Sequence, residues 1–182
     1  LLNEEGHLER MQQQPYEDED YAQQLLADYP DLLAGDEASD RRHRWLLVQR
    51  EMGVPDTEDR GSRWSVDHLF LDQDGIPTLV EVKRSSDTRI RREVVGQLLE
   101  YASNATSNWS IARIRASFEA HHEDPELHIS TQLGVDPDAI EQFWESVNNN
   151  LALGNIRLVF VADKIPEELK RIVEFLNEQM TP

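Results

Sequence analysis

Hydrophobic residues recur at helical spacing in several segments of this chain. Tyr21, Leu25 and Tyr29 are each four residues apart, which predicts a first helix over 17–29 that ends at a proline. The same periodicity predicts later helices over 88–104, 109–120, 137–152 and 166–179. Residues 121–128 are rich in His, Glu and Asp, and their spacing fits no standard metal-binding pattern, so we expect a solvated loop there.

Shorter apolar runs predict strands over 45–50, 65–72, 78–83 and 156–163. Asp74 and Gly75 lie between the second and third runs and favour a tight turn, so these two strands are expected to be antiparallel neighbours. The segment 52–63 contains two glycines and a proline, and we expect a loop. Strands that alternate with helices predict an α/β fold, in which helices flank a mixed central sheet.

The length of 182 residues is enough for one α/β domain with a hydrophobic core and short for two. Residues 1–16 are polar and Gln-rich and are expected to form a leader, which leaves 17–182 as a single domain. The last predicted helix is of the kind that usually feeds another strand. We therefore expect a domain that is truncated at its C-terminal end.

Three ionisable residues interrupt the apolar pattern of the two neighbouring strands. Asp67 lies on one strand, Glu81 and Lys83 lie on the next, and alternation places all three on one face of the sheet. Two carboxylates from adjacent strands offer the hard oxygen ligands that Mg²⁺ or Mn²⁺ prefers, and the ammonium can hold a water or a phosphate oxygen. The structural alternative is a cross-sheet ion pair on a solvated face.

Gln97 and Tyr101 lie four residues apart in the predicted helix over 88–104, so they project from the same helix face. This pair could complete a polar site next to the three charged residues. Polar residues at the boundary of a helix that packs on a sheet would give the same pattern, because an amphipathic Tyr is common at such positions.

Together these residues resemble the PD-(D/E)xK nuclease superfamily, and the Gln-x-x-x-Tyr addition resembles its RecB-type branch. The resemblance spans roughly 17–104 and implies a restriction-endonuclease-like fold that uses Mg²⁺ to hydrolyse a DNA phosphodiester bond. It implies that Asp67, Glu81 and the Val82 backbone carbonyl bind the metal ion. Lys83 would position the attacking water or stabilise the transition state, and Gln97 and Tyr101 would orient the phosphate.

The chain departs from the fullest pattern of that superfamily at two places. Val66 precedes Asp67 where the superfamily has Pro, which leaves the carboxylate in place. The superfamily often has a further acid on its first helix, and Glu19 is our choice for that metal ligand among the four acids of 17–20. These acids could equally be favoured by the positive N-terminal end of the helix.

The charge of the chain bears on its partners. There are 36 acidic and 18 basic residues, and the net charge of −18 argues against broad nonspecific binding to DNA. One dense basic cluster adjoins the motif, and we expect it to contact nucleic-acid phosphates locally: Arg84, Arg89, Arg91 and Arg92. An i,i+4 ion pair between Arg89 and Glu93 is the alternative. An acidic nuclease is also expected to need a recruiting protein or a missing domain.

Two other functions explain the acidity. One is a noncatalytic binding or regulatory module with a nuclease-like fold, and the other is an acidic protein-binding partner or nucleic-acid mimic. The intact combination of Asp67, Glu81 and Lys83 favours the enzyme. The sequence has no cysteine, which excludes disulfides and thiolate metal sites, and no signal peptide or long apolar run, so a cytoplasmic protein without membrane contact is expected. The sequence leaves the oligomeric state open.

Overall fold

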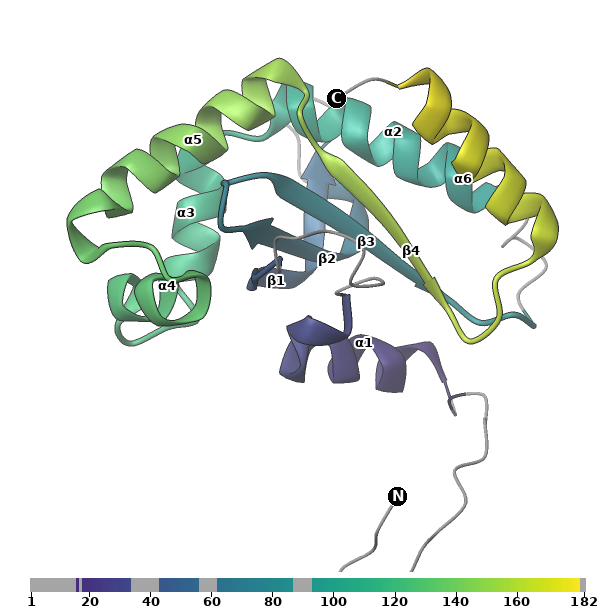
Figure 1. Ribbon diagram of the computed structural model, residues 1–182, viewed down its shortest axis with the longest axis horizontal. Coiled ribbons are helices and arrows are strands. Elements are labelled where there is room, and N and C mark those ends of the chain that lie inside the picture. Colours follow the sequence, from purple (N-terminus) through teal and green to yellow (C-terminus); the bar gives the residue numbers. More distant parts are fainter. Residues whose placement is uncertain (1–15, 17, 34–42, 56–61, 87–92, 181–182) are drawn as a thin grey trace, which may run out of the picture.

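The computed structural model describes residues 16, 18–33, 43–55, 62–86 and 93–180. These residues form a mixed four-stranded sheet flanked by helices (Figure 1). The strand order is β1-β2-β3-β4, where β1 and β3 are antiparallel to β2 and β4 is parallel to β3. The strands are β1 (Trp45–Pro55), β2 (Ser62–Asp72), β3 (Pro77–Lys83) and β4 (Arg157–Ala162).

Helices cover both faces of this sheet. On one face lies α1 (Glu19–Asp28), where Ala22 and Leu26 pack against Phe70, Val80 and Val82. The other face carries α2 (Glu93–Asn108), α3 (Ile111–Glu119), α4 (Pro125–Leu133) and α5 (Ile140–Leu153). Beside α2 on this face lies α6 (Glu167–Gln179), as Figure 1 shows. Two short 3₁₀ helices, η1 (Pro30–Leu33) and η3 (Pro137–Ala139), complete the described elements.

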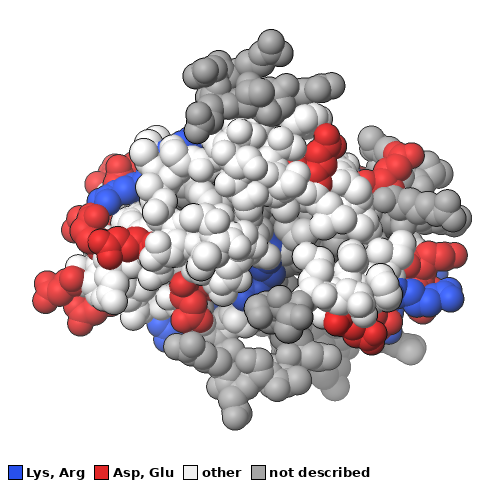
Figure 2. Space-filling view, turned by 90° about the horizontal axis from the view of Figure 1, so that it is seen from above, with Lys and Arg blue, Asp and Glu red and all other residues white. Residues whose placement is uncertain are grey.

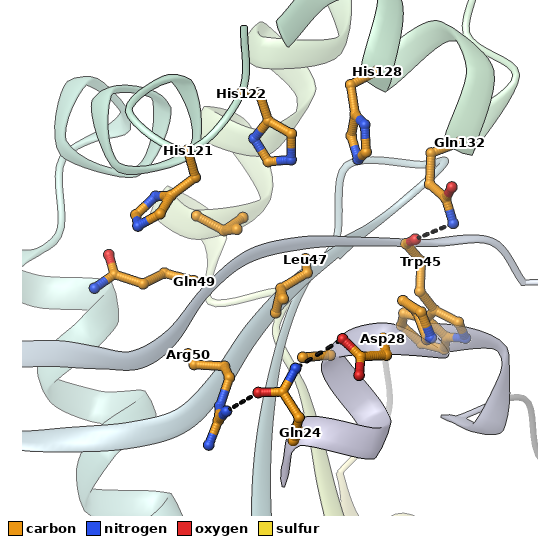
Figure 3. Close-up of a pocket in the computed structure, with 13 residues that line it drawn as sticks. Gln24, Asp28, Trp45, Leu47, Gln49, Arg50, His121, His122, His128 and Gln132 are labelled. Atoms are coloured by element: carbon orange, nitrogen blue, oxygen red, sulfur yellow. Dashed lines mark hydrogen bonds between the residues drawn. The ribbon is translucent and has the colours of Figure 1, made fainter.

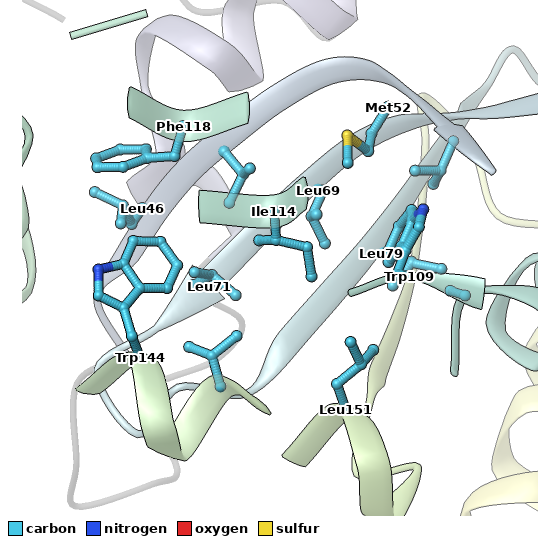
Figure 4. Packing of buried hydrophobic residues seen from close by; sticks show 14 of the residues in the cluster. Leu46, Met52, Leu69, Leu71, Leu79, Trp109, Ile114, Phe118, Trp144 and Leu151 are labelled. Carbon is cyan, nitrogen blue, oxygen red and sulfur yellow. The ribbon is translucent and has the colours of Figure 1, made fainter. Parts of the chain in front are cut away.

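The larger hydrophobic core lies between the sheet and α2 to α5. Leu69, Leu71 and Leu79 are fully buried in it, and Phe118 and Trp144 from the helices pack in the same cluster (Figure 4). The alternation of these leucines along β2 and β3 means that Asp67 and Glu81, which have the same parity, also belong to this face. The sheet therefore holds the predicted charged face against its larger core.

The turn between β2 and β3 is built around the buried carboxylate of Asp72. Its Oδ1 accepts hydrogen bonds from the backbone N–H groups of Asp74 and Ile76, and its Oδ2 accepts one from Arg157 on β4 at 3.0 Å. Gly75 has a φ of 73°, and a Cβ there would lie 3.0 Å from the backbone nitrogen of Val147 on α5. The expected Asp74-Gly75 turn is confirmed, and Asp72 both stabilises the turn and connects it to Arg157 on β4.

Two expectations for the connecting segments are wrong. The predicted loop over 52–63 is strand at both of its ends, because β1 continues to Pro55 and β2 begins at Ser62, and 56–61 lie outside the described residues. A glycine and a terminal proline are tolerated there because β1 is an edge strand. The expected loop over 121–128 contains the start of α4, which Asp124 caps by accepting a hydrogen bond from the Leu127 N–H. Pro125 then occupies the first turn, where its missing N–H costs nothing.

A buried histidine joins the sheet to α1. His68 on β2 is fully buried, and its Nε2–H donates to the Gln23 carbonyl at 2.8 Å. Its Nδ1 is buried and has no hydrogen-bond partner among the described residues. A second proton would have no acceptor, and burial lowers the pKa of His68 to about 4. The folded protein therefore holds this imidazole neutral.

We predict that His68 makes stability depend on pH. The pKa falls from 6.5 in the unfolded chain to about 4 in the folded protein, so the unfolded state takes up the proton first as pH decreases. The contribution is present above pH 6.5, and about 3 kcal/mol should be lost by pH 4. Chemical unfolding of the wild type and of His68→Gln, which keeps a donor for Gln23, measures this difference at pH 7 and pH 4.

His68→Phe is the matched control, because it removes both the titration and the hydrogen bond. It should be less stable than His68→Gln by a similar amount at both pH values. An unfolding free energy that changes equally with pH in the wild type and in His68→Gln would contradict the assignment.

Candidate functional site

The two central strands separate at the predicted site. β2 and β3 pair from Leu71 and Pro77 as far as His68 and Val80. Beyond that point β2 remains paired only with β1, and β3 remains paired only with β4 as far as Lys83. The Val82 N–H lies past the last pair and donates to the Asp67 Oδ2 at 2.7 Å. A carboxylate thus replaces the backbone of the neighbouring strand as the acceptor.

The Lys83 ammonium lies among three carboxylates. Its Nζ is 2.8 Å from Glu81 Oε1, 3.8 Å from Glu19 Oε2 and 4.0 Å from Asp67 Oδ2, and it donates to the Val82 carbonyl at 3.1 Å. Asp67, Glu81 and Lys83 therefore come together as the alternation predicts. They lie at the ends of two interior strands of the sheet.

Among the described acids at the start of α1, Glu19 is the one that reaches this cluster. Its Oε1 accepts a hydrogen bond from the Arg84 N–H at 3.1 Å, which ties α1 to the end of β3. Asp18 instead caps α1 by accepting from the Tyr21 N–H, and Asp20 pairs with Arg50. The fourth acid of 17–20, at position 17, lies outside the described residues.

Glu81 carries the most constrained charge of the site. Its side chain is 1% exposed, Oε1 accepts hydrogen bonds from Lys83 and Gln97, and the buried Oε2 has no partner among the described residues. Burial, with the charge of Asp67 second, raises the pKa of Glu81 to about 7. Burial also raises the pKa of Asp67, against the opposing effects of the Val82 N–H and Lys83. The charge of Asp67 thus disfavours ionisation of Glu81.

The pKa of Lys83 is also raised, and for an amine this shift favours the charged form. Burial by itself lowers the pKa of Lys83, but its hydrogen bond with Glu81 and the charges of Glu81, Asp67 and Glu19 outweigh burial and raise that pKa. The ammonium is therefore charged at neutral pH. A charged lysine in this position neutralises part of the carboxylate cluster.

Gln97 and Tyr101 lie on the face of α2 that reaches the site. The Gln97 amide Nε2 donates to Glu81 Oε1 at 2.9 Å and to the Tyr101 hydroxyl oxygen at 2.7 Å. Tyr101 is 5% exposed, and its ring centroid is 6.5 Å from that of Trp64. Gln97 thus donates a hydrogen bond to the Glu81 carboxylate, whereas the sequence led us to expect a contact between Gln97 and the phosphate.

Residues distant in the sequence fix the backbone of Lys83, and sequence reasoning missed them. The Tyr16 hydroxyl donates to the Lys83 carbonyl at 2.5 Å and accepts from the Asp163 N–H at 3.2 Å. The Asp163 carboxylate in turn accepts from the backbone N–H and the hydroxyl of Ser85. Tyr16 packs beside the core of α1, although its position predicted a place in the polar leader. Local spacing gives no signal for these long-range contacts.

Glu51 on the edge strand is a further acid near Asp67. It lies between the paired positions Arg50 and Met52, opposite Asp67, and its charge contributes to raising the pKa of Asp67. Its φ of 49° is the only positive value at a non-glycine position among the described residues. Nothing in the sequence pattern of β1 indicated this acid.

The predicted basic cluster is described only in part. Arg84 follows β3, and its buried Nε has no hydrogen-bond partner among the described residues. Arg89, Arg91 and Arg92 lie outside the described residues. On the face shown in Figure 2, the residues drawn in colour are mostly acidic, and the Lys and Arg side chains among them form no continuous patch.

No family model matches this chain, and comparisons with characterised proteins and with solved structures found no match either. Within the described part of the chain, no helix has the length and apolar character needed to cross a membrane. The same residues contain no group of three or more His, Asp or Glu side chains arranged to hold a metal ion. Oxygen atoms of Asp67, Glu81, Glu19 and the Val82 carbonyl nevertheless surround Lys83 Nζ.

We predict that Glu81→Gln stabilises the protein at pH 8. The folded pKa of about 7 lies above the value of 4.5 for an unfolded chain, so ionisation of Glu81 opposes folding progressively between these values. The neutral amide should raise the free energy of unfolding by roughly 1–3 kcal/mol at pH 8 and hardly change it at pH 4. Denaturant titrations at both values measure the effect, and the exposed Glu100→Gln on α2 is the control. A loss of stability at pH 8 would refute the account.

Proposed function

We propose that this chain is a metal-dependent DNA nuclease of the PD-(D/E)xK superfamily, related to its RecB-type branch, with a restriction-endonuclease-like fold. The observation that supports this most is the buried Glu81 Oε2, which has no partner, beside Asp67 and Lys83 where β2 and β3 separate. A buried carboxylate oxygen without a partner is costly. A divalent cation would provide a partner for the Glu81 Oε2 atom.

The chemistry of the donor set suits Mg²⁺ or Mn²⁺. Asp67, Glu81 and the Val82 carbonyl would be the ligands, with Glu19 as a further candidate, and all are hard oxygens. When bound, the cation would offset phosphate charge and lower the pKa of a bound water. Lys83 would release the Val82 carbonyl and turn its ammonium toward the attacking water or the phosphate. Gln97 would keep Glu81 oriented, and Tyr101 would support Gln97.

We predict that substitution of Lys83 impairs cleavage alone, whereas substitution of Asp67 impairs both metal binding and cleavage. Lys83→Ala should lose roughly 100-fold or more in cleavage rate and keep its Mg²⁺ affinity, because only carboxylates and carbonyls are ligands for a hard cation. Asp67→Ala should lose both. Calorimetric Mg²⁺ titration and cleavage of single-stranded, double-stranded and branched DNA measure the two effects.

Asp67→Asn shows whether a loss of Mg²⁺ binding in Asp67→Ala results from misfolding, because the Asn amide oxygen can still accept a hydrogen bond from the Val82 N–H. It should fold and still fail to bind Mg²⁺ tightly. Lys170→Ala on α6, an exposed lysine, is the control for loss of an ammonium. Unchanged Mg²⁺ affinity in both Asp67 variants would show that the ligand assignment is wrong.

A noncatalytic binding or regulatory module is the second candidate. The close ion pair between Lys83 and Glu81 favours it, because the ammonium already neutralises part of the carboxylate cluster. The net charge of −18 also favours it. Under this alternative the wild type binds Mg²⁺ weakly, cleaves none of the three DNA substrates, and loses stability in Lys83→Ala.

DNA binding by the proposed nuclease would be local. The unpartnered Arg84 Nε supports a phosphate contact beside the site, and the acidic chain offers little attraction at a distance. A recruiting protein or a further domain would then supply additional affinity.

We predict a shallow salt dependence of DNA binding by the inactive Lys83→Ala variant. A few arginine–phosphate contacts correspond to a slope of about −2 to −4 in log affinity against log salt concentration on duplex DNA. Changing Arg89, Arg91 and Arg92 to Glu should weaken binding and flatten the slope. The control changes Lys170 and Arg171 on α6 to Glu. Equal affinity and slope in both variants would exclude the cluster as the DNA-binding surface.

A further inference from the structure

The two edges of the sheet are protected to different degrees. β1 and β4 are the edge strands, and an uncovered edge strand presents backbone N–H and C=O groups that can pair with a strand of another chain. Native sheets prevent such pairing with charged residues, prolines, bulges, or helices and loops that cover the edge. A comparison of β1 with β4 therefore shows where a further strand could be added.

Side chains from the helices cover the backbone of β1. The Gln132 amide on α4 donates to the Trp45 carbonyl at 3.2 Å, and the Trp109 indole N–H donates to the Gly53 carbonyl at 3.0 Å. Figure 3 shows the first of these bonds, with His128 of the same helix on the same side of β1. The strand also has two register shifts against β2. A further strand therefore meets neither a regular nor an open edge at β1.

The edge at β4 is regular. Its register against β3 is unbroken from the pair of Thr78 with Arg157 to the pair of Lys83 with Ala162. The run from Leu158 to Ala162 contains no charged residue and no proline. Among the described residues, the hydrogen bonds of this strand are those of its ladder with β3 and those of the Arg157 guanidinium. The outward backbone groups of β4 are therefore open to a partner in the described part of the structure.

Both hydrophobic cores reach β4 and are incompletely covered there. Leu158 and Phe160 pack against the larger core and Val159 and Val161 against the core beside α1, yet every residue of β4 is only half-buried. In α6, which is described in full, Leu169 alone is fully buried. Partial exposure on both faces at once is expected when a strand lacks a neighbour at its side. An extended strand fits this edge, because it supplies backbone groups along the edge and side chains to both faces.

The charges at the two ends of this apolar run favour a second copy of the chain as the partner. Arg157 precedes the run, Asp163 follows it, and alternation places both on the same face. If two β4 strands pair antiparallel about Phe160, each Arg157 lies opposite Asp163 of the other copy. The Arg157 side chain is 30% exposed and uses Nη1 for Asp72, and Asp163 is half-buried, so both can take a further partner. A parallel arrangement would instead place like charges opposite each other.

We propose that two copies of this chain associate through their β4 edges, as antiparallel strands centred on Phe160, and thereby join their sheets into one. The two-fold axis is then perpendicular to the sheet, so the α6 helices of both copies lie on the same face of the joined sheet. This interface goes beyond the proposed nuclease function and does not depend on it. It uses no residue of the proposed metal site.

The first test measures association of the full chain by sedimentation velocity. At physiological salt the repulsion between two chains of net charge −18 is screened beyond about 8 Å, and the wild type should pass from monomer to dimer as its concentration rises through the micromolar range. Val159→Lys places a charge on the edge strand and should weaken the dimer about tenfold or more. Leu47→Lys is the matched control, because it makes the same change at a half-buried residue of the same core on β1, and it should dimerise like the wild type.

Cysteine substitutions test the register, because the sequence has no cysteine of its own. A short thiol-reactive linker should join two copies of Phe160→Cys, since this residue lies on the two-fold axis. Leu158→Cys and Ala162→Cys should not cross-link by themselves, because each lies opposite the other position of the second copy. An equal mixture of these two variants should therefore cross-link. Thermal unfolding verifies that each variant is folded, and if Val159→Lys does not fold, the mixture decides.

A folded wild type that stays monomeric throughout overturns the proposal and leaves a strand of another polypeptide as the occupant of this edge. A dimer that Val159→Lys and Leu47→Lys weaken equally, or in which neither Phe160→Cys nor the mixture cross-links, uses another surface and also overturns it. The exposed Tyr21 and Tyr29 of α1 would then be the next surface to test. Asp67→Asn should dimerise like the wild type, so failure of the nuclease proposal and failure of this interface are separate outcomes.

Discussion

The hydrogen bond from the Val82 N–H to the Asp67 carboxylate is the constraint on which the site depends. Where two antiparallel strands separate, each loses backbone partners, and a buried N–H without an acceptor is costly. Asp67 satisfies that N–H with a charged oxygen and thereby holds a carboxylate between the strands. The separation makes room for Glu81 and Lys83. The site therefore forms where the backbone pairing between β2 and β3 stops, at Val80, while β3 still continues beside β4.

Two buried titratable groups respond to pH in opposite directions. His68 is held neutral against α1, which favours the folded state at higher pH, and Glu81 resists ionisation, which favours the folded state at lower pH. The pKa of His68 falls from 6.5 to about 4, and the pKa of Glu81 rises from 4.5 to about 7, so the two effects on stability are similar in size and opposite in sign. The pH profile of the wild type alone would therefore hide both effects. His68 connects α1 to the sheet through its hydrogen bond. Glu81 lowers the stability of the folded protein when it is ionised, and such a cost is typical of functional residues.

Positive charge in this acidic chain is concentrated at a few places. Lys83 is enclosed by carboxylates, Arg157 is paired with Asp72 under the turn, and Arg50 is paired with Asp20 at the start of α1. All three are paired with acids of the chain itself.

The sequence by itself determined the elements that carry strong periodicity, the antiparallel pairing through the Asp74-Gly75 turn, and the shared face of Asp67, Glu81 and Lys83. These follow from the alternation of strands and the 3.6-residue repeat of helices, which are local properties. Only the tertiary structure decided which acid of α1 reaches the site, how Tyr16 and Asp163 hold the end of β3, and that Asp72 serves the fold. It also decided that three histidines of the 121–128 segment face the edge of β1. Contacts between residues distant in the chain depend on packing and leave no periodic trace in the sequence.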